Sequence, residues 1–183
     1  MALQKLSDGS GIVLSIGSGK TDKKYINNHG KKAELQTLWL FTDEHSLPNT
    51  KYVKADDTSL SLTVPINQDD STFEFFTRLD SLIEETVTDS TVHKFIIKKN
   101  DQYYVRFKLY QSTDLFLGKQ KQSVKSLLDF YNYLKPNTKF RLVFGFSHSW
   151  SMNGKTGFTA TVKRVQLDEA TQLDNNDITF YEE

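Results

Sequence analysis

The chain has 183 residues, a net charge of zero at pH 7 and no cysteine. This length favours a single domain, and the lack of cysteine excludes disulfides and thiolate metal sites. The N-terminus, MALQKLSDGS, lacks the apolar stretch of a signal peptide, and no window approaches a membrane span. We therefore expect an intracellular protein with no membrane contact.

The charge is distributed unevenly along the chain. Residues 1–42 carry a net charge of +3 and residues 43–90 carry −8. Residues 91–167 hold fourteen basic and three acidic residues, a net charge of +11, and residues 168–183 carry −6. A block this positive next to an acidic end is typical of a protein that binds a polyanion.

An apolar run from Ile12 to Ile16 predicts the first strand, and the segment GSGKT at positions 17–21 follows it. A phosphate-binding loop needs G-x-x-x-x-G-K-[ST], so its first glycine would stand where the chain has Leu14. The next residues, DKKYINNHGKK, lack helical periodicity. The segment is therefore predicted to be a loop between strands, solvated or facing an anion. The lysines that would close over an anionic ligand are Lys20, Lys23 and Lys24.

Further strands and a helix are predicted between residues 33 and 87. Residues 33–41 read as a strand with Leu35, Thr37, Trp39 and Phe41 on one face, and a loop around a short strand at 51–54 follows. Residues 59–66 alternate as a strand, which Pro65 confines to a sheet edge. A helix over 71–87 is expected to begin with a capping box of Ser71 and Glu74 and to bury an apolar face.

Two hairpins and a second helix complete the predicted elements. Residues 93–110 form two strands around Lys99–Gln102, and residues 114–118 form a short strand or loop. Residues 123–134 have helical spacing up to Pro136. A long strand over 139–150, an Asn-Gly turn and a returning strand over 156–167 form the last hairpin. Residues 168–183 are polar, acidic and predicted to be flexible.

Many short strands with two inserted helices predict an all-β fold. The first choice is an OB-like Greek-key barrel of five or more strands, and the second is a β-sandwich. Residues 1–167 are expected to form one nucleic-acid-binding domain, and residues 168–183 a flexible acidic C-terminal tail.

The titratable residues do not predict catalysis. The four histidines are scattered, and none stands at metal-ligand spacing from a carboxylate. The pairs Asp56–Asp57 and Asp69–Asp70 lie beside turn residues, which explains them better than a cation site. No serine lies in a nucleophile-elbow context. We expect a protein that is not an enzyme and has no metal and no cofactor.

The strand over 103–110 combines rings and cations on one face. Because side chains alternate, one face is a core face and the other carries Tyr104, Arg106, Lys108 and Tyr110. Single-stranded nucleic acid binds such a surface, since bases stack on rings and cations follow the phosphates. Tyrosines that fill a pleated surface and lysines that keep an edge soluble would give the same pattern.

The last hairpin adds positive charge near this strand. Trp150 stands at its turn, either as a stacking platform or as a plug for one end of the barrel. Small residues at 145, 147 and 149 leave room for another backbone. The expected phosphate contacts are Lys98, Lys99, Arg141, Lys155 and Lys163.

Residues 140–167, FRLVFGFSHSWSMNGKTGFTATVKRVQL, resemble the C-terminal hairpin of the OB-fold single-stranded DNA-binding proteins of large DNA viruses and phages. The shared features are Trp150, the turn Asn153–Lys155, the pair Gly157–Phe158 and a basic strand that ends at Leu167. The order of the preceding elements is also similar, so the resemblance covers roughly residues 71–167. It implies a protein that coats single-stranded DNA during replication or recombination without sequence preference.

The same resemblance gives the acidic tail a role. Phage and bacterial proteins of this kind end in an acidic tail with an aromatic near its end, as here with Phe180 and Tyr181. The tail would compete with DNA for the basic groove and dock replication proteins. Two residues follow the aromatics here, which departs from many relatives and bears on the docking role. The expected location is the bacterial cytoplasm for a phage protein, and the host nucleus or a viral replication site for a eukaryotic virus.

Other partners fit the same residues. Aromatic side chains on a β face also bind glycans or proteins, as in a virion component, although a glycan site has little need for so positive a block. An RNA-binding protein would use the same strand chemistry. The sequence leaves open the choice between DNA and RNA and whether the chain forms a homo-oligomer.

Overall fold

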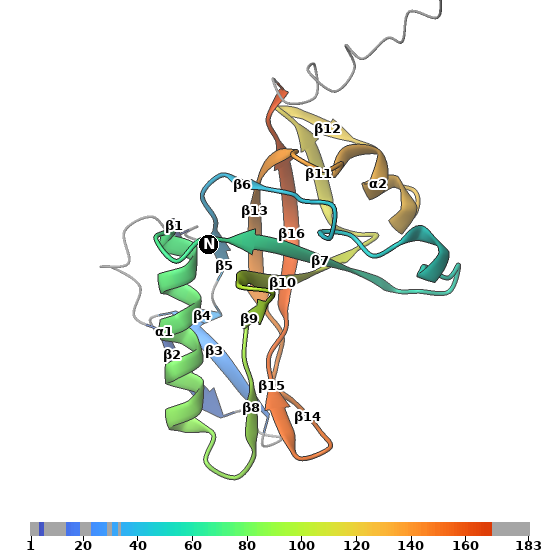
Figure 1. Ribbon diagram of the computed structural model, residues 1–183. Helices are drawn as coiled ribbons and strands as arrows, with labels where there is room; N and C mark the ends of the chain where they lie inside the picture. Colours follow the sequence, from blue (N-terminus) through green and yellow to red (C-terminus); the bar gives the residue numbers. More distant parts are fainter. Residues whose placement is uncertain (1–3, 6–13, 19–22, 29–30, 33, 170–183) are drawn as a thin grey trace, which may run out of the picture.

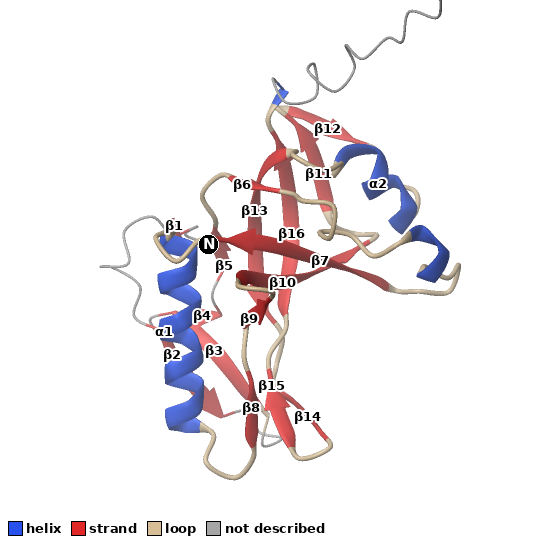
Figure 2. Cartoon of the chain, viewed as in Figure 1, coloured by secondary structure: helices blue, strands red, loops and turns tan. Residues whose placement is uncertain are grey.

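The computed structural model describes residues 4–5, 14–18, 23–28, 31–32 and 34–169. In this part of the chain strands predominate, and the α-helices are α1 (Ser71–Thr86) and α2 (Phe130–Tyr133). Figure 2 shows α1 beside the strands β2 and β3, whereas α2 lies at the other end of the molecule near β11 and β12. The prediction of a β-rich fold with two inserted helices is thus confirmed.

The main sheet joins strands from the whole length of the chain (Figure 1). Its strands follow the order β1 (Gln4–Lys5), β5 (Glu34–Gln36), β13 (Lys139–Phe146), β16 (Ala160–Leu167), β10 (Gln102–Tyr110) and β7 (Ser59–Ile66). Four strands pair beside this path, namely β6 (Leu40–Phe41), β9 (Ile96–Lys99), β11 (Asp114–Leu117) and β12 (Gln120–Gln122). β10 and β16 run parallel, whereas β10 is antiparallel to β7 and β13 is antiparallel to β16.

Two small sheets lie beside the main one. The first is formed by β2 (Leu14–Ser18), β3 (Lys24–Asn28) and β4 (Lys31–Lys32), and the second by β14 (Trp150–Met152), β15 (Lys155–Gly157) and β8 (Thr91–His93). The strand β3 stands where a phosphate-binding loop would need a helix. This finding confirms that GSGKT is not a P-loop, although residues 19–22 lie outside the described residues.

The strand β7 follows its predicted alternation. Leu60, Leu62, Val64 and Ile66 are buried, whereas the residues between them are half-buried. β7 ends the strand order and pairs with β10 along its length. Pro65 has no N–H to donate, and at the outer edge of β7 this causes no loss of a hydrogen bond in the sheet.

The predicted strand over 33–41 is interrupted by a bulge, which moves two aromatic side chains to the surface. Gln36 pairs with Val143 but Leu40 pairs with Phe140, so β5 and β6 contain one residue more than the facing part of β13. An extra residue reverses the alternation of side chains. Leu35 and Thr37 are buried, whereas Trp39 and Phe41 are 41% and 54% exposed, so the four residues do not share one face as predicted.

Several local predictions need correction. Residues 51–54 do not form a strand, because the 3-10 helix η2 (Thr50–Tyr52) lies there. The predicted helix over 123–134 shortens to η3 (Leu127–Asp129) and α2, since a capping box at Ser126 starts the turn there. α1 has Asp70 as its N-cap, and Ser71 does not form the predicted capping bond. The last hairpin is broken, so that β13 and β14, and also β15 and β16, are separate strands.

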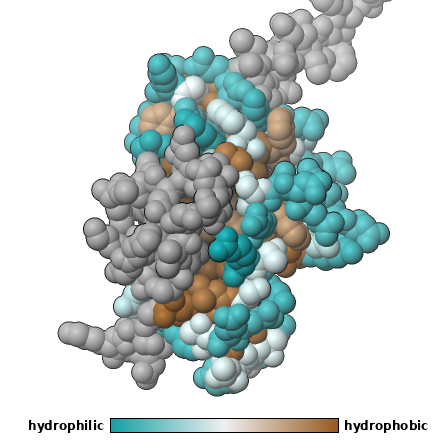
Figure 3. All heavy atoms as spheres, turned by 90° about the vertical axis from the view of Figure 1, so that its left-hand side faces the viewer, coloured by the Kyte–Doolittle hydropathy of each residue, from teal (hydrophilic) through white to brown (hydrophobic). Residues whose placement is uncertain are grey.

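The core combines aliphatic side chains with a group of phenylalanine rings that joins α1 to the main sheet. Phe76 of α1 stacks on Phe144 of β13 with 5.8 Å between the ring centroids, and it meets the edge of Phe107 of β10 at 5.9 Å. All of these rings are fully buried. Figure 3 looks onto the side of α1 and shows a hydrophobic area next to the grey atoms, with hydrophilic residues around it.

Candidate nucleic-acid interface

The strand β10 presents the predicted row of rings and cations away from the core. Val105, Phe107 and Leu109 are fully buried, so the side chains between them point to the other side of the sheet. Arg106 is exposed, and Tyr104, Lys108 and Tyr110 are half-buried. Their partners on β7 are small, with Pro65 opposite Tyr104, Thr63 opposite Arg106, Ser61 opposite Lys108 and Ser59 opposite Tyr110. The short side chains of β7 thus form a shallow floor beside the long side chains of β10.

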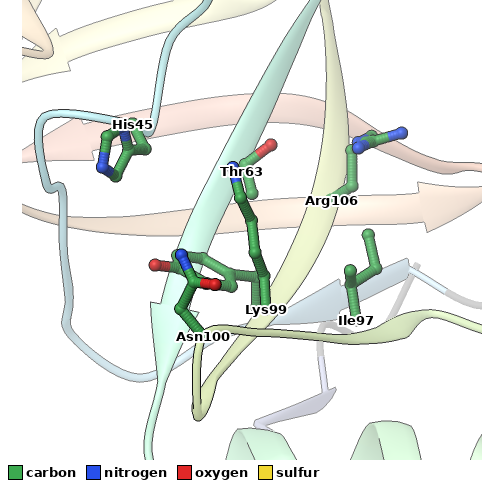
Figure 4. A pocket seen from close by; sticks show the side chains of 7 residues that line it. His45, Thr63, Ile97, Lys99, Asn100 and Arg106 are labelled. Carbon is green, nitrogen blue, oxygen red and sulfur yellow. The ribbon is translucent and has the colours of Figure 1, made fainter.

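A first hollow opens at the Tyr104 end of this row. It has a volume of about 330 Å³, and its lining residues are His45, Thr63, Ile97, Lys99, Asn100, Tyr104 and Arg106. In Figure 4 the Lys99 side chain extends towards Thr63, and His45 approaches from the loop before β7. A cation thus lies over the small residue of the floor, with loop residues as walls.

A second hollow of about 520 Å³ continues from the first, since Ile97 and Arg106 line both. Its polar and charged lining includes His93, Lys94, Lys108 and Thr159, and its apolar lining includes Phe95, Trp150, Met152 and Phe158. The two hollows together form a groove, and we use this word for them below. Arg106 stands where they join.

Trp150 is held in place by a glycine on the facing strand. A Cβ atom at Gly157 would lie 2.6 Å from Cζ2 of Trp150, so only glycine leaves room for the ring. The His93 ring meets the indole edge with 5.2 Å between the centroids. Trp150 is half-buried and lines the second hollow. It therefore packs against the hairpin and also offers surface to the groove, and its roles as stacking platform or barrel plug stay predictions.

The cations at the centre of the groove have no acidic partner in the described part of the chain. Within residues 34–169, Arg106, Lys99 and Lys108 form no ion pair, and Lys108 Nζ lies 3.3 Å from Ser59 Oγ. Lys94 differs, because its Nζ lies 2.9 Å from Glu84 Oε1 of α1, and this carboxylate raises the pKa of Lys94. Uncompensated cations in a hollow attract anions more strongly than paired ones.

A buried carboxylate of α1 fixes the strand that forms one wall of the groove. Asp80 is 4% exposed, and its oxygens accept the backbone N–H groups of Phe95 at 2.8 Å and Ile96 at 3.1 Å. Burial raises the pKa of Asp80, against the opposite effect of these hydrogen bonds. The contact sets the start of β9, which carries Ile97 and Lys99 into the groove.

Both hairpins turn at the residues that the sequence predicted. Asn100 and Asp101 have positive φ angles of 48° and 61°, and Asn153 and Gly154 have 53° and 71°. Positive φ at both central residues is the geometry of a type I′ turn, which asparagine and glycine favour. The first turn places Asn100 at the end of the first hollow.

The remaining predicted contacts are dispersed. Lys98 pairs with Tyr103 across the hairpin, on the face opposite to Tyr104, and its Nζ lies 3.4 Å from Asp101. Tyr110, Lys155, Arg141 and Lys163 line neither hollow. A two-residue turn at 100–101 pairs Lys98 with Tyr103 and Lys99 with Gln102, which places the two lysines on opposite faces of the hairpin. The sequence therefore already contained the signal that only Lys99 shares the face of Tyr104.

Of the three lysines predicted to close over an anionic ligand, the structure describes Lys23 and Lys24. Lys24 Nζ donates to the Thr86 carbonyl at 3.0 Å, which ties it to the C-terminal end of α1. Lys23 is exposed. Lys20, Phe180 and Tyr181 lie outside the described residues.

The sequence reasoning missed several groove residues, among them His45, His93 and Asn100. They come from loops or short strands without a periodic signal, and pairing brings them to the groove. In the described part of the chain, no group of three or more His, Cys, Asp or Glu side chains could hold a metal ion. None of the described helices has the length and apolar character needed to cross a membrane.

Comparison with solved structures gives matches among phage proteins. The single-stranded DNA-binding protein of bacteriophage Enc34 in complex with ssDNA matches with a TM-score of 0.50 and 12% identity, over 84% of this chain and 94% of that one. A C-terminal truncation of that protein matches at 0.49 and 12%, over 85% and 94%. The protein gp2.5 of bacteriophage T7, also a single-stranded DNA-binding protein, matches at 0.49 and 10%, over 75% and 92%.

No protein-family model matches the sequence, and no curated protein matches it. The structural likeness to phage single-stranded DNA-binding proteins extends over most of the chain at low sequence identity, as the resemblance predicted. At this identity the match concerns the fold.

Proposed function

We propose that this protein binds single-stranded DNA along the groove, without strong sequence preference and without catalysis. The observation that carries the proposal is the position of Arg106, an exposed cation without an ion-pair partner among residues 34–169, where the two hollows join. Tyr104 lines one hollow and Trp150 the other, so bases can stack on both sides of a phosphate contact. The known ligand of the Enc34 protein supports this choice.

The strand topology supports an OB-like barrel as the scaffold. OB folds bind oligonucleotides on the face of their second and third strands, between the loops that follow the first and fourth strands. β7 and β10 would be that face, the loop with His45 and the β14–β15 hairpin its walls. Barrel closure would run through the loop before β7, where the Thr63 N–H donates to the Ser46 carbonyl at 2.8 Å.

The likeness to phage single-stranded DNA-binding proteins suggests a wider role. We infer that the protein coats single-stranded DNA during replication or recombination and protects it. Residues 1–167 would form the binding domain. Residues 168–183 would be a flexible acidic tail that competes with DNA and docks replication proteins through Phe180 and Tyr181. Lys155 would contact phosphates at the margin of the groove, and Lys20 and Lys23 would close over the bound DNA, whereas Lys98 faces away from the groove and Lys24 is held at the Thr86 carbonyl.

The test is fluorescence anisotropy with labelled oligo-dT, oligo-U and duplex DNA over a salt series. Oligo-dT is expected to bind tightly at low salt, with an affinity that falls linearly on a log–log plot as counterions are displaced. Duplex DNA is expected to bind weakly, because its stacked bases cannot reach the rings. Absence of oligo-dT binding at low salt would refute the proposal, and a clear preference for oligo-U would assign the groove to RNA.

A further inference from the structure

A second set of rings and cations lies on the outer side of β13, β16 and β11. Leu142, Val165 and Leu115 are fully buried and face one another across these strands. The side chains next to them therefore point outward. The register places Arg141 of β13, Gln166 of β16, Phe116 of β11 and Lys121 of β12 in one row across the sheet. We call this surface, with Trp39 and Arg164 included, the outer face.

Trp39 begins this row because of the bulge between β5 and β6. Its ring is 41% exposed, although it belongs to a segment with strand periodicity. Lys139 Nζ lies 5.2 Å and Arg141 Cζ 5.3 Å from the ring centroid. Leu38 and Phe41 beside it are also exposed. An indole with two cations near its ring is a cation–π arrangement, and the exposed part of Trp39 offers area for stacking.

Two guanidinium groups of the outer face are oriented but not neutralised. Arg141 Nε donates to Gln166 Oε1 at 2.7 Å, and Gln166 Nε2 donates to the Gly118 carbonyl at 2.8 Å. Arg164 Cζ lies 4.8 Å from the centroid of Phe116. Within residues 34–169 neither arginine forms an ion pair, since Lys121 takes Asp114 and Lys139 pairs with Asp168. Planar guanidinium groups that are held in place and keep N–H donors available are suited to hydrogen-bond phosphate oxygens.

The outer face continues from the groove. Lys108 at the groove pairs with Thr161 near the start of β16. The register between β13 and β16 shifts after this point, where Phe144 faces Val162 but Val143 faces Arg164. Lys163 is the extra residue, and both Lys163 and Arg164 are exposed. Cations thus lead along β16 from Lys108 to the outer face.

We propose that the outer face binds a further stretch of the same single strand that the groove holds, with Trp39 as the stacking ring and Arg141 and Arg164 on phosphates. This inference depends on the proposed function of the groove. The continuous line of cations and the pairing of rings with guanidinium groups favour a polynucleotide over a separate anionic ligand. A DNA single strand longer than the groove would continue along β16 and end at Trp39.

The length of the oligonucleotide separates the two surfaces. One OB-type fold covers about 4–16 nucleotides, so an oligo-dT of about 6 nucleotides tests the groove and one of about 20 tests both surfaces. DNA is kept in excess, so that one protein binds each strand. Trp39→Ala is expected to weaken binding of the long oligonucleotide by about fivefold or more. It should leave the affinity for the short one unchanged.

Arg164→Gln is expected to act in the same direction and to reduce the salt slope for the long oligonucleotide by about one. Lys135→Gln removes the same charge at an exposed position beside α2 and serves as the control. The control is expected to bind both oligonucleotides as the parent protein does.

Tryptophan fluorescence gives a direct reading, because the chain has two tryptophans. In Trp150→Phe the signal comes from Trp39, and only the long oligonucleotide should quench it. In Trp39→Phe the signal comes from Trp150, and both oligonucleotides should quench it. These variants keep a ring at each position.

Three results would overturn the inference and can be told apart. If the parent protein binds neither oligonucleotide, the proposed function fails and the outer face fails with it. If it binds both but Trp39 is not quenched and Trp39→Ala is neutral, the groove stands and the outer face does not bind DNA. Altered sedimentation of Trp39→Ala with unchanged DNA binding would assign the outer face to a second copy of the chain, which also refutes the inference.

Discussion

The groove and the outer face use the same residue types in different surroundings. In the groove, loops wall the row of β10, and Arg106 has no partner among residues 34–169. On the outer face, cations already lie over the rings of Trp39 and Phe116. A walled hollow strengthens electrostatic attraction and holds a ligand on several sides. We therefore expect the groove to supply most of the affinity and the outer face to extend the site.

The largest expected effect is that of Tyr104→Ala on a short oligo-dT. The loss of one stacked base should weaken binding by about 1–3 kcal/mol, whereas Trp39→Ala should leave the same oligonucleotide unaffected. Anisotropy titrations of both variants measure the contrast, and circular dichroism checks the fold. Equal affinities for Tyr104→Ala and the parent protein would remove the groove from the centre of the site.

Gly157→Ala tests whether the position of Trp150 matters to the groove. The new Cβ would lie 2.6 Å from the indole and 3.0 Å from His93 Cβ, so the ring must move. Overpacking of this kind costs about 1–3 kcal/mol in the free energy of unfolding, and short oligonucleotides should bind more weakly.

Gly154→Asn is the matched control for this glycine. No atom lies within 4 Å of a Cβ at Gly154, and asparagine tolerates its φ of +71°. If Gly157→Ala and Gly154→Asn bind DNA equally well, Trp150 is only a structural plug.

Asp80→Asn should loosen the wall of the groove and leave the outer face in place. An amide offers one acceptor oxygen for the N–H groups of Phe95 and Ile96, and one unsatisfied N–H costs about 1–3 kcal/mol. Urea unfolding of the variant and the parent protein measures the loss. Short oligonucleotides should report the weaker wall.

The pH dependence of this loss has a defined sign. Burial raises the native pKa of Asp80 above its ordinary value of 3.8. The native state therefore binds the proton more tightly than the unfolded state, and this contribution to stability is complete below pH 3.8. It is lost as the pH rises through the native pKa. The parent protein should lose stability relative to Asp80→Asn over that window, and parallel profiles would contradict the assignment.

Removal of residues 170–183 tests competition for both surfaces and should have a smaller effect. The segment contains the acidic residues Asp174, Asp177, Glu182 and Glu183. Binding is expected to tighten a few-fold at low salt, and the gain should shrink as salt screens the charges. Replacement of the four residues by Asn or Gln at full length should act equally. Unchanged affinity in both proteins would exclude competition by charge.

The smallest expected effect is that of Glu84→Gln. This change frees Lys94, which lines the second hollow but is paired at 2.9 Å. Because exposed ion pairs are weak, the gain in affinity for a short oligonucleotide should be about twofold. A salt series should show a slightly steeper slope than for the parent protein. A loss of affinity would indicate that Lys94 needs Glu84 for its orientation.

Local sequence signals predicted the row of rings and cations on β10. Most residues that wall the groove could not be predicted, because they reach it only through pairing between distant segments. The alternation of side chains over 103–110 follows from the two-residue period of a strand, and the Asn-containing turns follow from the φ angles that asparagine adopts. Both effects depend only on residues that are close in the sequence. His45 and His93 have no such signal, since His45 lies in the loop before β7 and His93 in the short strand β8, which pairs with the distant β15. Lys98 was grouped with Lys99 although the turn places them on opposite faces.

The sequence by itself determined a β-rich chain with two inserted helices, its two type I′ turns and the ring-and-cation row of β10. Only the tertiary structure decided that Trp39 is exposed, that Gly157 holds Trp150 and that Arg106 joins two hollows. The physical reason is the range of the forces involved. Side-chain alternation and turn angles are set within a few residues, whereas a bulge, a close approach and a hollow exist only once distant strands have paired.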